Sequence, residues 1–141
     1  MKDIEIAKKY LEEENLAIAV VKDGNLIFKS HDKGIKPMYT LATQMVEMTK
    51  GSSIADKVIG RGAAMLCDSL YVKEVYGKLI SDNAIEVLKK SGIIFSYGNI
   101  CDYIKNRDGT DICPIEKIAL QSENSEVLLS KIKGFFKAAS R

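Results

Sequence analysis

Apolar residues along this chain recur at the spacings typical of helices and of strands. In residues 4–11 they lie three or four positions apart, with Lys and Glu between them, which predicts a helix. The apolar runs 16–21 and 26–28 flank the polar turn sequence Lys22-Asp23-Gly24-Asn25, so we expect a β-hairpin there.

A second helical pattern begins at Pro37, whose missing N–H suits the first turn of a helix, and is expected to reach Thr49. After it, short apolar runs bounded by glycine or serine predict strands at 54–60 and 75–80. The intervening residues 63–72, rich in Ala, Met and Leu, predict a helix.

Capping residues mark the elements that follow. Ser81 is a natural N-cap and Gly92 a natural C-cap, which predicts a helix between them, and a strand is expected at 93–97. An irregular stretch then leads to a last amphipathic helix, for which we take Ser122 as the N-cap.

This order of elements predicts an α/β fold. The hairpin would form an antiparallel edge, and three parallel strands would be joined by helical crossovers, giving a mixed five-stranded sheet. With helices on both faces, the sheet would be the middle of a three-layer α/β/α sandwich. A length of 141 residues suits one domain, so we expect residues 1–141 to form a single one.

Composition and charge narrow the class of protein. Apolar residues make up 46% and charged residues 28%, with only 10 Gly and 2 Pro, so the chain is globular. Because 21 Lys and Arg nearly balance 19 Asp and Glu, we expect no nucleic-acid or membrane partner. The longest apolar run, 16–21, is too short to span a bilayer and the acidic start is unlike a secretory signal, so a cytoplasmic protein is expected.

The cysteines give no metal or disulfide pattern. Cys67, Cys101 and Cys113 are odd in number and widely spaced, and His31 is the single histidine. We therefore expect neither a metal site nor a cofactor, and we interpret Cys67 and Cys101 as small core residues.

Gly60-Arg61-Gly62, between a predicted strand and a predicted helix, is the strongest candidate for a site. A helix N-terminus presents free N–H groups to an anion, and glycines let a phosphate approach closely. Asp56 and Lys57 would lie in the same cleft, binding a ribose hydroxyl and a phosphate, with Arg107 nearby. The alternative is a tight turn with a solvated Arg61, and Asp56 and Lys57 as a surface pair.

Cys113-Pro114-Ile115-Glu116 has the pattern of a helix start, with Pro114 at the first position. The helix dipole would lower the pKa of Cys113, and with Arg107 folded back over the turn the thiolate would be a nucleophile or a sulfur carrier. The alternative is a structural cysteine, because the chain has no histidine nearby to act as its base.

Two segments carry a resemblance to a known family. Residues 56–64 and 106–116, together with Lys36-Pro37 and Ile80-Ser81, resemble a small prokaryotic family of unknown function within the cytidine deaminase-like superfamily. The resemblance implies that fold, with the glycine turn where the superfamily carries out its chemistry. Zinc deaminases, however, place His-x-Glu and Pro-Cys-x-x-Cys at the starts of two helices, and this chain lacks both, which argues against hydrolytic deamination.

We therefore expect a zinc-free deaminase-like domain that binds a nucleotide or nucleotide-derived phosphate. The expected ligand-binding residues are Asp56, Lys57, Gly60, Arg61, Gly62 and Arg107. One alternative is a metal-independent transfer enzyme that uses Cys113 as its catalytic residue. Another is a non-catalytic homo-oligomeric interaction module that assembles through the sheet edge or through the last helix at Phe136.

Overall fold

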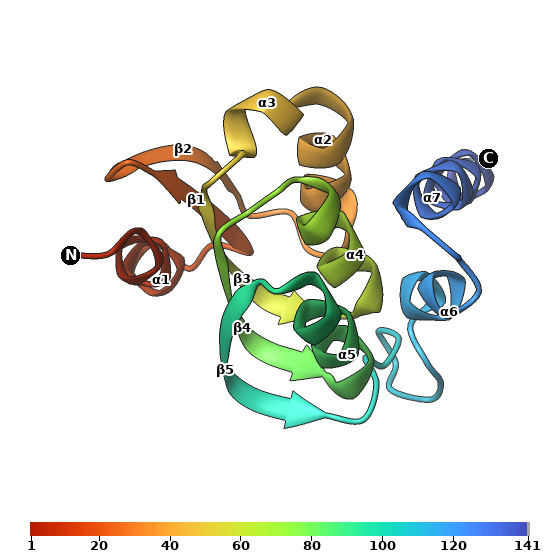
Figure 1. Cartoon of the computed structure of the whole chain (residues 1–141). Helices are drawn as coiled ribbons and strands as arrows, with labels where there is room; N and C mark the ends of the chain where they lie inside the picture. The colour runs from red at the N-terminus through yellow and green to blue at the C-terminus, as the bar shows by residue number, and fades with distance from the viewer. Residues whose placement is uncertain (141) are drawn as a thin grey trace.

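The computed structural model describes residues 1–140 and contains five strands and seven helices (Figure 1). Their bounds are α1 (Asp3–Glu13), β1 (Ile18–Lys22), β2 (Asn25–Ser30), α2 (Lys36–Gln44), α3 (Val46–Thr49), β3 (Ser53–Ile59), α4 (Arg61–Ser69), β4 (Glu74–Ser81), α5 (Asp82–Ser91), β5 (Ile94–Cys101), α6 (Pro114–Leu120) and α7 (Ser125–Ala139). No helix within the described residues has the length and apolar character needed to cross a membrane.

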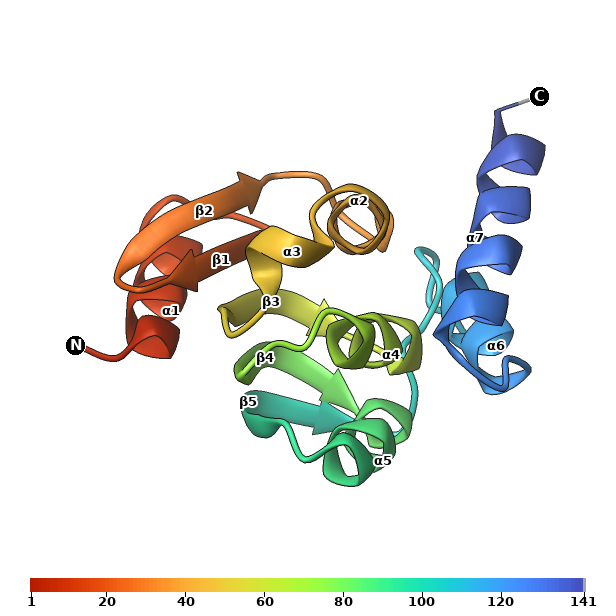
Figure 2. The ribbon, with the colours of Figure 1, turned by 45° about the horizontal axis from the view of Figure 1, so that its top comes forward.

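The five strands form one mixed sheet in the order β2-β1-β3-β4-β5 (Figure 2). β1 runs antiparallel to both β2 and β3, whereas β3, β4 and β5 are parallel to one another. The α/β fold with a mixed five-stranded sheet and a hairpin at its edge is therefore confirmed.

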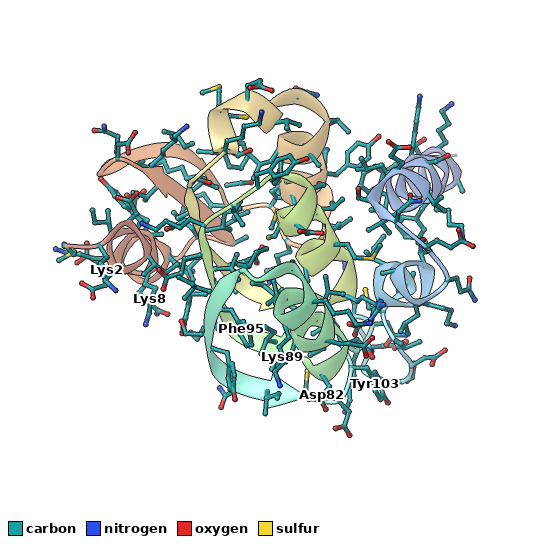
Figure 3. All side chains as sticks on the ribbon, viewed as in Figure 1. Lys2, Lys8, Asp82, Lys89, Phe95 and Tyr103 are labelled. Carbon is teal, nitrogen blue, oxygen red and sulfur yellow. The ribbon has the colours of Figure 1, made fainter. Side chains whose placement is uncertain are left out.

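The two faces of the sheet bury unequal amounts of apolar surface. Alternate side chains of β1 divide between them: Ile18 and Val20 join the larger cluster, which contains residues of α4 and α5, while Ala19 and Val21 join a smaller cluster under α1. α1 packs on β1 and β3 and reaches β4 less closely. There the ammonium of Lys8, which is labelled beside α1 in Figure 3, lies close to the sheet. It is 4.3 Å from the centroid of the Tyr76 ring.

The predicted caps of α5, Ser81 and Gly92, are confirmed. The Ser81 hydroxyl accepts a hydrogen bond from the Ala84 N–H at 3.1 Å, and Gly92 adopts the left-handed conformation (φ 77°) that ends the helix. β5, however, continues four residues beyond its predicted end at Tyr97, to Cys101.

Two helix predictions are corrected. The helix expected from Pro37 to Thr49 is interrupted at Met45, whose backbone (φ −131°, ψ 25°) ends α2 before α3 begins. Ser122 is not the N-cap of the last helix, because its hydroxyl donates to the carbonyl oxygen of Ile118 in α6. Asn124 caps α7 instead, accepting a hydrogen bond from Val127 N–H at 2.9 Å.

The last helix packs against the rest of the chain through Phe136. Its ring meets Tyr39 of α2 edge to face, with centroids 5.2 Å apart. Phe135 is the exposed member of the pair, at 37%. Phe136, which is partly exposed, therefore helps to hold α7 against α2, and assembly through this residue stays a prediction.

Candidate functional site

A cavity of about 350 Å³ lies at the carboxyl end of β3. Five segments far apart in the sequence enclose it: the start of β1, the loop before α2, the end of β3, the first turn of α4, and the segment from Ile104 to Glu116. Most of its wall is apolar. The apolar side chains include Ile18, Ile35, Met38, Val58, Ile104 and Ile115.

Asp56 is the acidic residue that β3 contributes to this cavity. One of its carboxyl oxygens accepts a hydrogen bond from the Val58 N–H at 3.1 Å, and no salt bridge joins it to a cation within residues 1–140. Burial raises the pKa of Asp56 to about 7, although the hydrogen bond from Val58 opposes the shift. Near neutral pH this carboxyl group can therefore either donate or accept a proton.

Lys57 also lines the cavity, but its charge is engaged elsewhere. Its ammonium donates a hydrogen bond to the side-chain oxygen of Asn15 at 2.6 Å. The Lys57 ammonium is therefore bound by Asn15, although Lys57 and Asp56 line the same cavity as expected.

Glu116 of α6 is the second carboxylate at this end of the sheet, and only 2% of it is exposed. One oxygen accepts hydrogen bonds from the Arg61 N–H at 2.9 Å and from the Ser81 hydroxyl at 2.6 Å. The other accepts a hydrogen bond from the Ile104 N–H. This one side chain therefore joins the start of α4, the end of β4 and the segment that follows β5.

The two glycines of the predicted anion-binding turn make room for this C-terminal segment. A Cβ atom on Gly60 would lie 3.0 Å from Ile104 Cγ1 and 3.2 Å from the Glu116 carboxylate, and one on Gly62 would lie 3.0 Å from Ile115 Cγ2. The Arg61 N–H, where we expected an external anion, is bound by the chain's own carboxylate. Both glycines nevertheless line the cavity.

The two predicted arginines do not line the cavity. The Arg61 guanidinium extends toward α5, where it lies 3.4 Å from the Asn83 carbonyl oxygen and 3.5 Å from a Glu86 carboxylate oxygen. Arg107 is exposed in the loop between β5 and α6. The structure thus gathers four of the six predicted ligand-binding residues at the cavity: Asp56, Lys57, Gly60 and Gly62.

The three cysteines are free and differ in their environments. Cys113 lines the cavity, is partly exposed, and precedes Pro114 at the start of α6 as expected. Cys67 is buried in the larger core cluster, and burial together with the nearby Asp56 carboxylate raises the pKa of its thiol. Cys101, which we interpreted as a core residue, is instead partly exposed at the end of β5.

Sequence reasoning missed Glu116 and the apolar character of the cavity. In the sequence, Glu116 stands out only as a member of the helix start Cys113-Pro114-Ile115-Glu116. Its three donors come from residues 12 to 55 positions away in the chain, so no local pattern could reveal them. Within residues 1–140, no group of three or more His, Cys, Asp or Glu side chains is placed to hold a metal ion.

The comparisons with known proteins place the chain in a family. Residues 6–136 match the family described as a domain of unknown function, DUF1893 (TM1506), and the chain belongs to this family. Its structure is similar to the crystal structure of a DUF1893 family protein, TM1506, from Thermotoga maritima, with a TM-score of 0.84 and 27% sequence identity. That similarity covers 95% of this chain and 90% of the other. No curated protein matches the sequence.

Proposed function

We propose that the cavity binds a nucleotide-type small molecule, with the base held between the apolar walls and against Asp56. The observation that carries this proposal is the Asp56 carboxyl group, which forms no salt bridge within residues 1–140 and lies in a cavity whose wall is mostly apolar. We further propose that residues 1–141 form a single cytosolic domain with a zinc-free, cytidine deaminase-like three-layer sandwich.

The size and the walls of the cavity suit a planar heterocycle. Its volume lies near the lower end of the range of roughly 300–1,000 Å³ that is typical of small-molecule sites. Side chains such as Met38 and Ile115 would contact the faces of a ring, and the Asp56 carboxyl would pair with ring or amino N–H groups at its edge. With a base bound in this way, both carboxyl oxygens of Asp56 would have hydrogen-bond partners.

A phosphate group would lie toward the rim of the cavity. Glu116 already binds the Arg61 N–H at the start of α4, and a second anion beside that carboxylate would be repelled. Lys33, an exposed residue in the loop before α2, lines the cavity, forms no salt bridge within the described residues 1–140, and would contact a phosphate there. In this proposal the cavity binds the base and Lys33 at the rim contacts the phosphate. Arg61 and Arg107, which we expected to bind the phosphate, have no part in it.

Thermal unfolding with added ligands tests this proposal. We expect a nucleoside or nucleoside monophosphate at about 100 times its dissociation constant to stabilise the wild type by about 2.7 kcal/mol, or a few degrees. Asp56→Asn should lose most of this shift, because an amide cannot accept hydrogen bonds at both positions. Asp68→Asn, an exposed aspartate on α4, is the matched control and should keep the shift.

Two outcomes would contradict the proposal. One is an equal ligand shift in the wild type and in Asp56→Asn. The other is stabilisation by inorganic phosphate alone, with no further gain from the base.

A second candidate function is thiol-dependent transfer at Cys113, because this partly exposed residue lines the same cavity. Fast alkylation of Cys113 near neutral pH, slowed by a bound nucleotide, would favour it. Alkylation at the rate of an ordinary exposed thiol would argue against it.

A further inference from the structure

β5 forms an edge of the sheet that no other element within residues 1–140 covers. It is the last strand in the order β2-β1-β3-β4-β5, and nothing lies along its outer side in Figures 1 and 2. Because alternate residues of a strand point their N–H and C=O groups to the same side, roughly half of its eight residues direct both groups outward. Such an edge is a template for another strand.

The opposite edge of the sheet carries the features that normally prevent such pairing. β2 is shorter, at six residues, and Lys29 near its end forms an ion pair of 2.7 Å with Glu14. Its pairing with β1 is also irregular, with a shift in register between Val20 and Val21. Charges, bulges and short length all discourage association through an edge strand.

β5 has none of these protections. Residues 91–101 contain no charged side chain and no proline, in a chain of which 28% is charged. The pairing of β5 with β4 keeps one register from Ile94 to Cys101. Residues 96–100 are all exposed.

The exposed apolar residues of β5 are arranged symmetrically. Phe95 faces the core (Figure 3), whereas Ile94, Tyr97 and Ile100 are 57%, 45% and 49% exposed. They lie three positions apart, so Ile94 and Ile100 share one face of the strand while Tyr97 points to the other. Tyr97 is the centre of this arrangement.

We propose that β5 pairs antiparallel with β5 of a second copy of this chain, around a two-fold axis that passes beside Tyr97. A two-fold axis perpendicular to a sheet keeps each side chain on its own face and places residue 97 opposite itself. Ile94 of each copy then lies opposite Ile100 of the partner, and the two tyrosines meet on the other face. The result is a continuous ten-stranded sheet.

The lack of charge favours a second copy as the occupant of this edge. In a two-fold pairing a strand meets its own sequence, so a lysine or glutamate near its centre would face a like charge, which is destabilising. β5 avoids this conflict, because no cross-strand pair in this register contains a charged side chain. Its outer pairs join Ile94 to Ile100 and its central pair joins Tyr97 to itself, while the pairs between them contain the uncharged residues Asn99, Ser96 and Gly98. The cavity at the end of β3 is not part of this interface, so the dimer does not depend on the proposed ligand.

Measurement of the molar mass in solution, by light scattering or sedimentation over about 1–100 µM, tests the proposal. We expect the wild type to reach the mass of a dimer. Tyr97→Lys places two ammonium groups at the axis and should give a monomer at concentrations where the wild type is dimeric. Tyr71→Lys adds the same charge at a residue that is 68% exposed and lies after α4, so it should remain dimeric.

Charge pairing tests the register. Ile94→Lys alone should weaken the dimer at least tenfold, whereas the double variant Ile94→Lys/Ile100→Glu sets opposite charges across the axis and should restore it. Circular dichroism checks that each variant is folded. A monomeric wild type, a dimeric Tyr97→Lys, or a double variant no stronger than Ile94→Lys would each overturn the proposed interface.

Discussion

Two carboxyl groups at the same end of the sheet have opposite environments. Glu116 is almost fully buried and accepts three hydrogen bonds, from Arg61, Ser81 and Ile104. Asp56 accepts a hydrogen bond from one backbone N–H and faces a cavity with a mostly apolar wall, where burial raises its pKa to about 7. The carboxylate of Glu116 stabilises the fold through its hydrogen bonds, whereas Asp56, with one hydrogen bond, is the group to which we assign the proposed ligand contact.

The largest expected effect comes from removing the satisfied group. Glu116→Ala leaves an N–H on Arg61, an N–H on Ile104 and the Ser81 hydroxyl without their acceptor, and we expect it to destabilise the protein by about 3–5 kcal/mol. Unfolding in urea measures the change. Glu123→Ala, an exposed glutamate between α6 and α7, should change stability by less than about 0.5 kcal/mol.

A loss from Glu116→Ala no larger than that of Glu123→Ala would erase the difference between the two carboxyl groups. It would mean that water replaces the carboxylate at no cost.

The next effect concerns Asp56 and pH. Its folded-state pKa of about 7 lies above the ordinary value of 3.8, so the folded protein binds the proton more tightly than the unfolded chain. Stability is therefore highest where the carboxyl is protonated, and it decreases as pH rises toward 7. Asp56→Asn should remove this dependence and be more stable than the wild type at pH 8, by about 2 kcal/mol.

Thermal midpoints of the wild type and of Asp56→Asn between pH 4 and 8.5 measure this difference. We expect the two curves to converge at the acidic end. A constant offset across the range would show that Asp56 titrates normally and that its environment resembles water.

The smallest effect tests the turn between the two carboxyl groups. Gly62→Ala places a Cβ 3.0 Å from Ile115 Cγ2, so α6 must shift, at an expected cost of about 1–2 kcal/mol. Gly134→Ala is the matched control, because a Cβ in the middle of α7 meets nothing within 4 Å and should stabilise the helix by about 0.5–1 kcal/mol. Urea unfolding compares both with the wild type, and equal stabilisation would show that α6 is loosely packed.

Local signals in the sequence predicted most of the fold but only part of the site. Ser81 and Gly92 correctly marked the two ends of α5, because helix capping depends on residues that are neighbours in the sequence. The spacing of apolar residues identified all five strands. The break at Met45 was missed because the apolar pattern continues through it. The sequence around α7 offers two residues suited to capping, Ser122 and Asn124, and local pattern alone does not decide between them. The structure shows that Asn124 is the cap, whereas Ser122 bonds back to α6.

The site depends on contacts between distant residues. The sequence placed Gly60 and Gly62 at a strand-to-helix turn, and the structure agrees, but the space that they leave is filled by Ile104, Ile115 and Glu116. The direction of the Arg61 side chain is set by Glu86 and Asn83 of α5, which no spacing rule relates to it. Tertiary contacts therefore decided which predicted residues reach the cavity.

The contacts of Glu116 also bear on the order in which the protein folds. Its partners Arg61 and Ser81 lie 55 and 35 residues earlier in the chain, and contacts of such separation form slowly because a long loop must close first. During synthesis, β1 to β4 leave the ribosome before Glu116, because β4 ends at Ser81, 35 residues earlier in the chain. A newly made chain therefore passes through a stage in which the Arg61 N–H and the Ser81 hydroxyl lack the carboxylate that binds them in the finished fold.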